Sequence, residues 1–163
     1  MNPWIDAAIL WVHLFSAVLF VGGSFFFWLV LEPVSYRVVS DEAARTVLIG
    51  RLARRFGQFT TPLLIILILT GLYNASWYLP SLSDPLASLP GQVLVLKAVV
   101  VLALVILIYV HGIYFGRRIS RLARAGDVDG LRQIRRTSRV VSYVNLGLML
   151  AVLALAVALQ MVG

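Results

Sequence analysis

Four long apolar stretches constrain the fold of this chain more than any other feature of its sequence. Each holds roughly 20 or more mostly apolar residues, the length that an α-helix needs to cross a lipid bilayer. A backbone surrounded by hydrocarbon must pair its own polar groups, so such stretches cross the membrane as helices. We therefore predict an all-α integral membrane protein, a four-helix bundle in a single domain covering residues 1–163. The predicted spans are residues 4–31, 56–78, 91–115 and 140–162.

The composition supports lipid as the solvent. Hydrophobic residues make up 61% of the chain and charged residues 13%, whereas an ordinary soluble domain has about 45–50% and about 25%. A soluble domain of this length could not bury so much apolar surface. The chain contains no Cys, which excludes disulfides, iron–sulfur clusters and thiolate metal sites.

The basic residues predict how the spans are oriented. All thirteen Arg lie in residues 32–55 or 116–139, while the connection between spans two and three and both termini carry none. Because basic loops stay in the cytoplasm, we predict an up-down-up-down bundle in the plasma (inner) membrane with both termini outside. The net charge of +7 then predicts contact with anionic lipid heads at the inner face. We predict no nucleic-acid partner.

Both Arg-rich connections also carry helix signals. Ser40, Asp41 and Glu42 are typical of a helix N-terminus. The sequence "RRISRLARAG" predicts that the third helix continues past the membrane and ends at Gly126. The following "DVDG" lacks the further ligand positions and closing Glu of a calcium loop, so it predicts a turn with a helix cap.

Polar side chains within the spans are candidate functional residues, because they are costly in a bilayer. From the helix rise, His13 lies about 10–13 Å below the outer end of its span, Lys97 about 9 Å and Asn74 about 6 Å. Gln160 lies close to the outer end of span four. Four helices thus each offer one polar side chain at a similar depth, as bundles do when they build cofactor or metal sites.

His111 belongs to a different level. It follows Lys97 by fourteen residues, roughly 21 Å along the same helix axis, and so lies near the cytoplasmic side. His13 and His111 therefore cannot bind one metal ion together. For His111 the pattern favours a structural hydrogen bond over a second, inner metal site.

Each outer residue also has a structural interpretation. Lys97 could extend its ammonium to the headgroups, and His13 could make an interhelical hydrogen bond. Asn74 and Gln160 are typical of hydrogen bonds between helices. We expect small residues to allow close helix approach at Gly22, Gly23, Gly71 and Gly147.

The residue types at the outer level suit copper or haem chemistry. Imidazole binds copper, zinc and haem iron, and thioethers favour Cu(I), so His13 with Met161 is a conceivable copper pair. A haem b would need His13 as its axial ligand, with Lys97, Tyr73 or Trp77 near its propionates. The chain lacks a Ser–His–Asp set, a phosphate loop and an HExxH motif. We therefore expect a non-enzymatic protein; an enzyme here would be an oxidoreductase using haem.

Three stretches resemble the copper resistance protein D (CopD) family. "VHLFSAVLFVGGSFFF" is similar to that family's first helix, "RRFGQFTTPLLIILILTGLYNA" to its next, and "LPGQVLVLKAVVVLALVILI" to the following one. The related HemJ-type membrane proteins, which bind haem and oxidise protoporphyrinogen, pair a first-helix His with a third-helix Lys. His13 and Lys97 match those positions in kind.

The resemblance implies copper handling, by binding or import, at an outer-half site around His13 and Lys97. One alternative is a b-type haem protein for electron transfer or porphyrinogen oxidation. Another is a non-catalytic subunit of a larger membrane complex. A homo-oligomer is compatible with each of these functions.

Overall fold

The protein consists of four long helical rods. Its computed structural model describes residues 2–78 and 85–162. Within them, four helices are long and apolar enough to cross a membrane, and there is no strand, which confirms the predicted all-α membrane class. The elements are α1 (Pro3–Phe26), the π-helix η1 (Phe27–Leu31), α2 (Glu32–Val38), α3 (Glu42–Ala75), α4 (Leu89–Val110), the π-helix η2 (His111–Phe115), α5 (Gly116–Ala125) and α6 (Val128–Val162).

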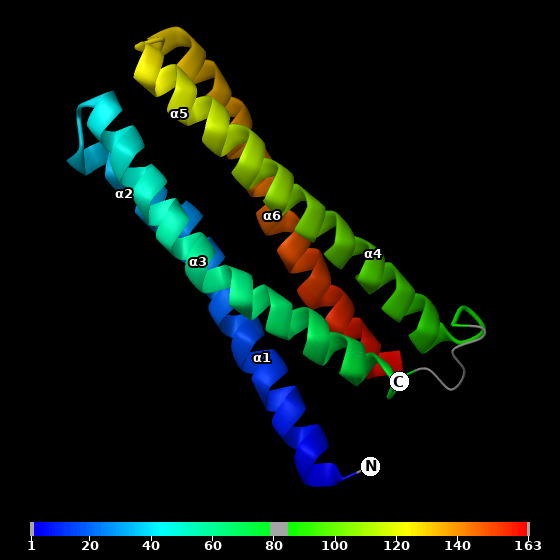
Figure 1. Ribbon diagram of the computed structural model, residues 1–163. Coiled ribbons are helices and arrows are strands. Elements are labelled where there is room, and N and C mark those ends of the chain that lie inside the picture. The colour runs from blue at the N-terminus through cyan, green and yellow to red at the C-terminus, as the bar shows by residue number, and fades with distance from the viewer. Residues whose placement is uncertain (1, 79–84, 163) are drawn as a thin grey trace.

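The helices pair into two hairpins. The first hairpin is α1, η1 and α2 packed along α3, and the second is α4, η2 and α5 packed along α6 (Figure 1). The turns after α2 and after α5 lie at the same end of the molecule, and the start of α1 and the end of α6 lie towards the other. We call the end with the two turns the turn end.

The rods extend well beyond the predicted spans. They contain 34 to 37 residues, so each is roughly 51–56 Å long, compared with about 30 Å of hydrocarbon. Residues 32–55 and 116–139, predicted as partly helical connections, are helical except at the two short turns.

The predicted helix boundaries at these turns are confirmed. The Asp41 carboxylate accepts a hydrogen bond of 2.7 Å from the Ala44 amide at the start of α3. Gly126 ends α5 with φ of 70°, a left-handed conformation that glycine adopts without steric cost. Asp127 accepts a hydrogen bond of 2.9 Å from the Gly130 amide in the first turn of α6.

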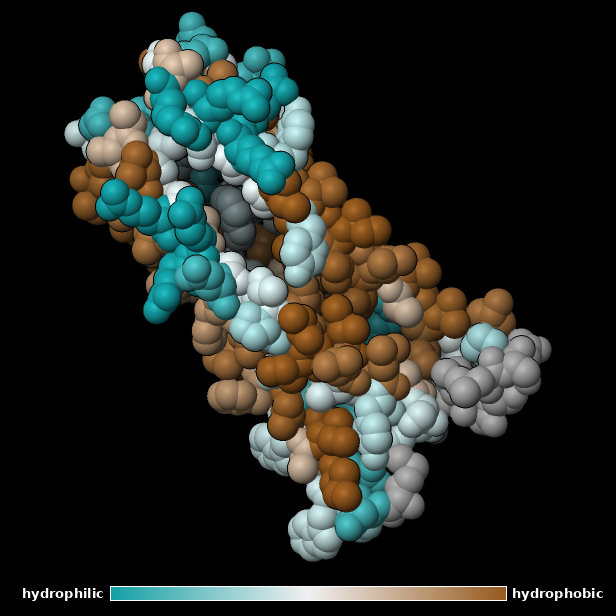
Figure 2. All heavy atoms as spheres, in the orientation of Figure 1, coloured by the Kyte–Doolittle hydropathy of each residue, from teal (hydrophilic) through white to brown (hydrophobic). Residues whose placement is uncertain are grey.

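Apolar side chains cover the middle of the molecule and hydrophilic ones its turn end (Figure 2). In the most apolar window of the third rod, only 6% of residues are buried inside the chain. Large side chains such as Trp11, Val18 and Leu72 are exposed. This surface must face lipid or another membrane helix, because exposing so large an apolar surface to water is unfavourable.

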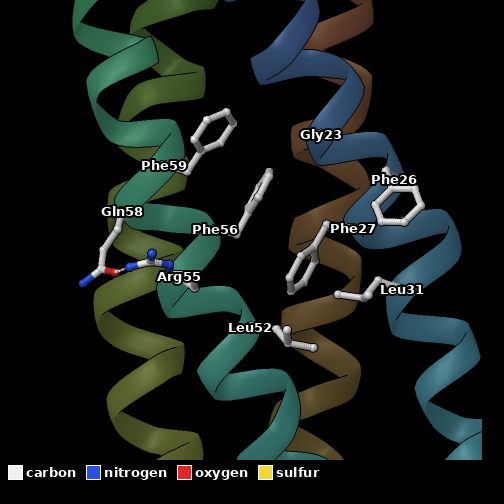
Figure 3. Close-up of a pocket in the computed structure, with 9 residues that line it drawn as sticks. All are labelled: Gly23, Phe26, Phe27, Leu31, Leu52, Arg55, Phe56, Gln58 and Phe59. Atoms are coloured by element: carbon white, nitrogen blue, oxygen red, sulfur yellow. Dashed lines mark hydrogen bonds between the residues drawn. The ribbon is translucent and has the colours of Figure 1, made fainter.

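Both hairpins contain a π-helical turn at corresponding points of their first rods, and no sequence pattern predicted either. Single π-turns inside α-helices are rare. In η1, Phe27 stacks on Phe56 of α3 with ring centroids 5.3 Å apart (Figure 3). In η2, His111 is the first residue.

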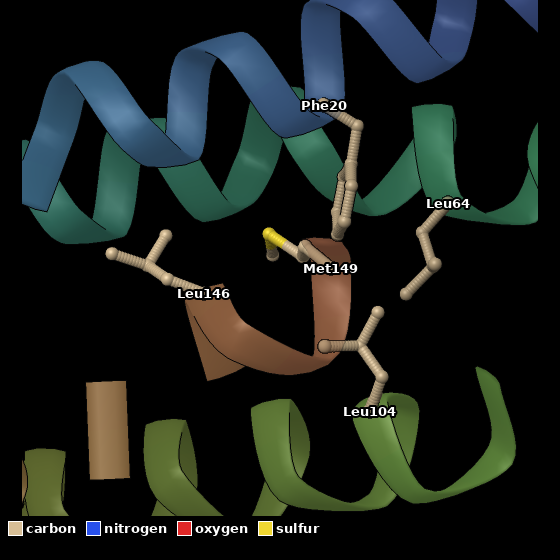
Figure 4. Close-up of a cluster of buried hydrophobic side chains, with 5 residues drawn as sticks. All are labelled: Phe20, Leu64, Leu104, Leu146 and Met149. Carbon is tan, nitrogen blue, oxygen red and sulfur yellow. The ribbon is translucent and has the colours of Figure 1, made fainter. Parts of the chain in front are cut away.

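The buried core lies where the two hairpins meet. Its side chains come from all four rods and point toward one another (Figure 4). Leu146 and Met149 of α6 supply two of them, so α6 contributes more side chains to this core than any other rod. The remaining members are Phe20, Leu64 and Leu104.

Polar contacts join the hairpins at the turn end. The Tyr36 ring of α2 lies between two guanidinium groups, with Arg45 Cζ at 4.3 Å and Arg139 Cζ at 5.1 Å from its centroid. Arg139 also donates a hydrogen bond of 2.6 Å to the Tyr36 hydroxyl and lies 3.5 Å from the Glu32 carboxylate. Two further contacts join α3 to α6: Arg132 with Glu42 and Arg135 with Thr46.

Two of the four close approaches expected at glycine are present. A Cβ added to Gly23 would lie 3.0 Å from the Phe56 ring, and one on Gly71 would lie 3.3 Å from His13. At Gly22 and Gly147 an added Cβ would meet no described atom within 4 Å. The expectation is therefore wrong at those two positions, because their open sides face away from neighbouring helices.

Replacing a core residue should cost stability that replacing its exposed neighbour does not. Met149 is 4% exposed and Leu150 is 54% exposed. We expect Met149→Ala to lower the free energy of unfolding by about 2 kcal/mol or more, because it leaves a cavity. Leu150→Ala should cost at most about 0.5 kcal/mol. Denaturant titration in detergent measures both, and equal losses would contradict this core.

Candidate functional site

The first part of the predicted outer-half site is a contact between α1 and α3. His13 of α1 is half-buried, and its Nδ1 lies 2.8 Å from the Thr70 hydroxyl oxygen of α3. Thr70 lies on the same face of α3 as Asn74, one turn away. The sequence reasoning missed Thr70, although its four-residue spacing from Asn74 indicated a shared face.

The hydrogen bonds of Thr70 fix which nitrogen of His13 carries the proton. The Thr70 hydroxyl donates to the Ile66 carbonyl at 2.6 Å, as a helical threonine commonly does. Its only proton is then used, so Thr70 accepts from His13 and Nδ1 carries the imidazole proton. Neutral His13 therefore presents an unprotonated Nε2, the state that binds a metal or haem iron.

Gly71 makes room for the imidazole. A Cβ at this position would lie 3.3 Å from Cε1 and 3.9 Å from Nδ1 of His13. A larger side chain would push the ring out of its place beside Thr70. Thr70 thus forms a hydrogen bond with the His13 ring, and Gly71 leaves space for that ring.

Asn74 contributes a polar group without a partner. Its Oδ1 is buried and accepts no hydrogen bond from the described residues. A buried acceptor left unpaired costs about 1–3 kcal/mol, and such groups call for a ligand, a water or a partner. Asn74 Oδ1 therefore makes no interhelical hydrogen bond within the described residues, and the place of Asn74 in the site stays a prediction.

Lys97 of α4 is the site residue predicted on the second hairpin. It is half-buried, whereas its neighbours Leu96 and Val99 are 53% and 58% exposed. Its place beside His13 stays a prediction. Its ammonium forms no ion pair with a carboxylate of residues 2–78 and 85–162.

Gln160 and Met161 do not join this group. Gln160 is exposed, and its amide donates a hydrogen bond of 2.6 Å to the Tyr78 hydroxyl. Gln160 thus makes the interhelical hydrogen bond of its structural interpretation. Met161 is 82% exposed at the end of α6 and so is not packed against His13. Within one chain the proposed His13–Met161 copper pair is therefore not assembled.

His111 lies in separate surroundings. Its Nε2 is 2.9 Å from the hydroxyl of buried Ser138, and the Trp28 and Phe115 rings lie 6.1 Å and 5.0 Å from its own. This is the hydrogen-bonded role that the sequence favoured. Among the described residues no group of three His, Cys, Asp or Glu side chains could hold a metal ion, so His111 has no such companions for a second metal site there.

An acidic residue lies near the outer site. The Asp6 carboxylate of α1 accepts a hydrogen bond of 2.7 Å from the Tyr73 hydroxyl, and Tyr73 adjoins Asn74 on α3. Asp6 precedes His13 by seven residues, two helical turns, so the two lie on one face of α1. Sequence reasoning did not single out Asp6, which lies in the first turn of α1.

A comparison with protein families decides the family. The family described as copper resistance protein D matches residues 50–159. The chain belongs to the copper resistance protein D family. The CopD match begins in α3, ends near the end of α6 and includes Asn74 and Lys97, whereas His13 lies before it. No curated protein and no solved structure matches the chain.

The proton on His13 can be observed directly. With only two His in the chain, ¹⁵N spectra of the labelled protein in detergent should show neutral His13 protonated at Nδ1. Thr70→Val removes the acceptor and should abolish this preference, while Thr61→Val should not, because Thr61 is exposed and makes no side-chain hydrogen bond among described residues. A proton on Nε2 of His13 in the unaltered protein would contradict the arrangement.

Proposed function

We propose that this CopD-family chain handles copper, by binding or import, at the outer-half site around His13 and Lys97. The observation that carries the proposal is the hydrogen bond from His13 to Thr70, which leaves Nε2 unprotonated inside a membrane-length bundle. The family supports copper as the cargo. Imidazole is a ligand suited to copper. The Asn74 side-chain oxygen, one helical turn from Thr70 on α3, offers a second ligand atom.

The proposal includes an orientation. Both termini lie on the outer side of the plasma membrane, in an up-down-up-down bundle, because all thirteen Arg lie toward the turn end. The Asp6–Tyr73 pair then stands on the outer side of His13. A carboxylate in that position attracts cations and raises their local concentration.

Lys97 sets how tightly copper is held. An ammonium beside the ligand would repel a bound cation and so weaken its binding. A transport site must bind its ion well enough to admit it and weakly enough to release it. A site with a single imidazole and a nearby positive charge would bind copper weakly. Weak binding suits copper transport better than copper storage.

A b-type haem is the second candidate, and Lys97 is the observation that favours it. A half-buried ammonium suits a propionate carboxylate, because the two groups form a charge-assisted hydrogen bond. His13 Nε2 would be the axial ligand, and the bound haem would supply electron transfer or porphyrinogen oxidation. The described residues offer one such imidazole at the outer level, so ligation would be by a single His.

The visible spectrum and metal content of the protein in mild detergent separate the candidates. For copper, we expect stoichiometric metal without a Soret band, and we expect His13→Ala to lower affinity at least tenfold by removing the imidazole ligand. His111→Ala is the matched control, because His111 already bonds to Ser138. A Soret band lost in His13→Ala would transfer the assignment to haem.

Lys97→Gln should change the affinity for copper and the affinity for haem in opposite directions. It removes the repelling charge, so copper affinity should rise severalfold. Haem affinity should instead fall, because the propionate loses its partner. If the protein takes up neither copper nor haem and His13→Ala leaves its stability unchanged, both site proposals fail and a non-catalytic subunit of a larger complex remains.

The orientation has its own test. A reporter fused after the last residue should be active on the outer side, and one inserted after Gly126 should be active in the cytoplasm, because the Arg-rich segments stay inside. Paired phosphatase and fluorescent-protein fusions read both locations. A cytoplasmic C-terminus would overturn the outer placement of His13 and Lys97.

A further inference from the structure

A cleft opens between α1 and α3 on the turn-end side of the molecule's middle. Its volume is about 620 Å³, within the range of about 300–1,000 Å³ of small-molecule sites. It is lined by Gly23, Phe26, Phe27, Leu31, Leu52, Arg55, Phe56, Gln58 and Phe59. None of these residues belongs to the His13 site.

The cleft walls are aromatic and are shaped by backbone features. Phe27 and Phe56 point into the space between α1 and α3 and stack on each other (Figure 3). Gly23 lets the Phe56 ring approach, because a Cβ there would lie 3.0 Å from it. The π-turn η1 begins at Phe27 and so forms part of the wall. Such turns often occur at functional sites.

One edge of the cleft is polar. Arg55 and Gln58 belong to the lining but extend from α3 on the side away from Phe27 (Figure 3), where the guanidinium donates a hydrogen bond of 3.5 Å to the Gln58 side chain. The cleft edge thus holds a cation beside a polar amide side chain.

Further arginines stand beside Arg55. Arg51 precedes it by one turn and Arg54 is its neighbour; all three are exposed. None forms an ion pair with a carboxylate among residues 2–78 and 85–162. Phe56 follows Arg55 directly in α3, while Leu31 and Leu52 line the cleft nearer to the turn end.

We propose that this cleft binds one anionic phospholipid, with its phosphate at Arg55 and an acyl chain against the stacked Phe27–Phe56 pair. The lining fits a lipid of the leaflet at the turn end, since it combines apolar side chains with a guanidinium from the Arg-rich part of α3. Arginine forks suit phosphate oxygens. The proposal goes beyond copper handling and needs only that the chain is embedded in a bilayer.

Native mass spectrometry of the protein from detergent can test the site with phosphatidylglycerol and phosphatidylcholine of identical acyl chains. We expect one phosphatidylglycerol to bind at least fivefold more tightly than phosphatidylcholine. Arg55→Gln should weaken phosphatidylglycerol binding about fivefold, the effect of one basic residue at a lipid surface. Arg121→Gln, an equal charge change on exposed α5, should leave binding unchanged.

A second pair of variants tests the apolar part. Leu52→Phe fills the cleft and should weaken binding of both lipids, whereas Leu48→Phe, one turn away and 40% exposed, should not. The unfolding temperature of each variant separates lost binding from lost folding. Equal binding of the two lipids, equal effects of the two Arg variants, displacement by millimolar inorganic phosphate alone, or unaltered binding to a folded Leu52→Phe protein would each overturn the proposal.

Discussion

Hydrocarbon offers no hydrogen-bond partner, and this one constraint governs the whole chain. Backbone amides must pair along the helix, so chemistry is left to the few polar side chains in the spans. These must also find partners nearby: Thr70 donates to its own helix and Thr60 does the same. His13 then uses Thr70 as acceptor, which frees its other nitrogen. The availability of Nε2 is thus a consequence of the solvent that surrounds the bundle.

Sequence reasoning predicted the features that are encoded locally. The number and kind of helices follow from apolar length, and the turns follow from Asp41, Gly126 and Asp127, whose roles depend on residues within three or four positions. Helix rise also gave the depth of each polar residue. Depth does not give direction around the helix axis, however. Gln160 and Met161 therefore shared a level with His13 without sharing a face.

The features that the sequence did not indicate depend on contacts between helices. Thr70, the two π-turns and the pairing into hairpins arise from how α1 meets α3 and how α4 meets α6. The α1–α3 interface carries both the His13 contact and the aromatic cleft. Glycine governs the spacing at each, through Gly71 and Gly23, because a single methyl group there would press on a ring.

The division into hairpins bears on how the protein is made. The His13–Thr70 bond lies wholly within the first hairpin, so the imidazole can find its partner before the ribosome has completed the second. Lys97 arrives later, on a rod that carries no carboxylate of its own in α4. The proposed site would therefore be completed only when the hairpins dock, and a chain arrested halfway through synthesis would hold the His13–Thr70 pair without Lys97.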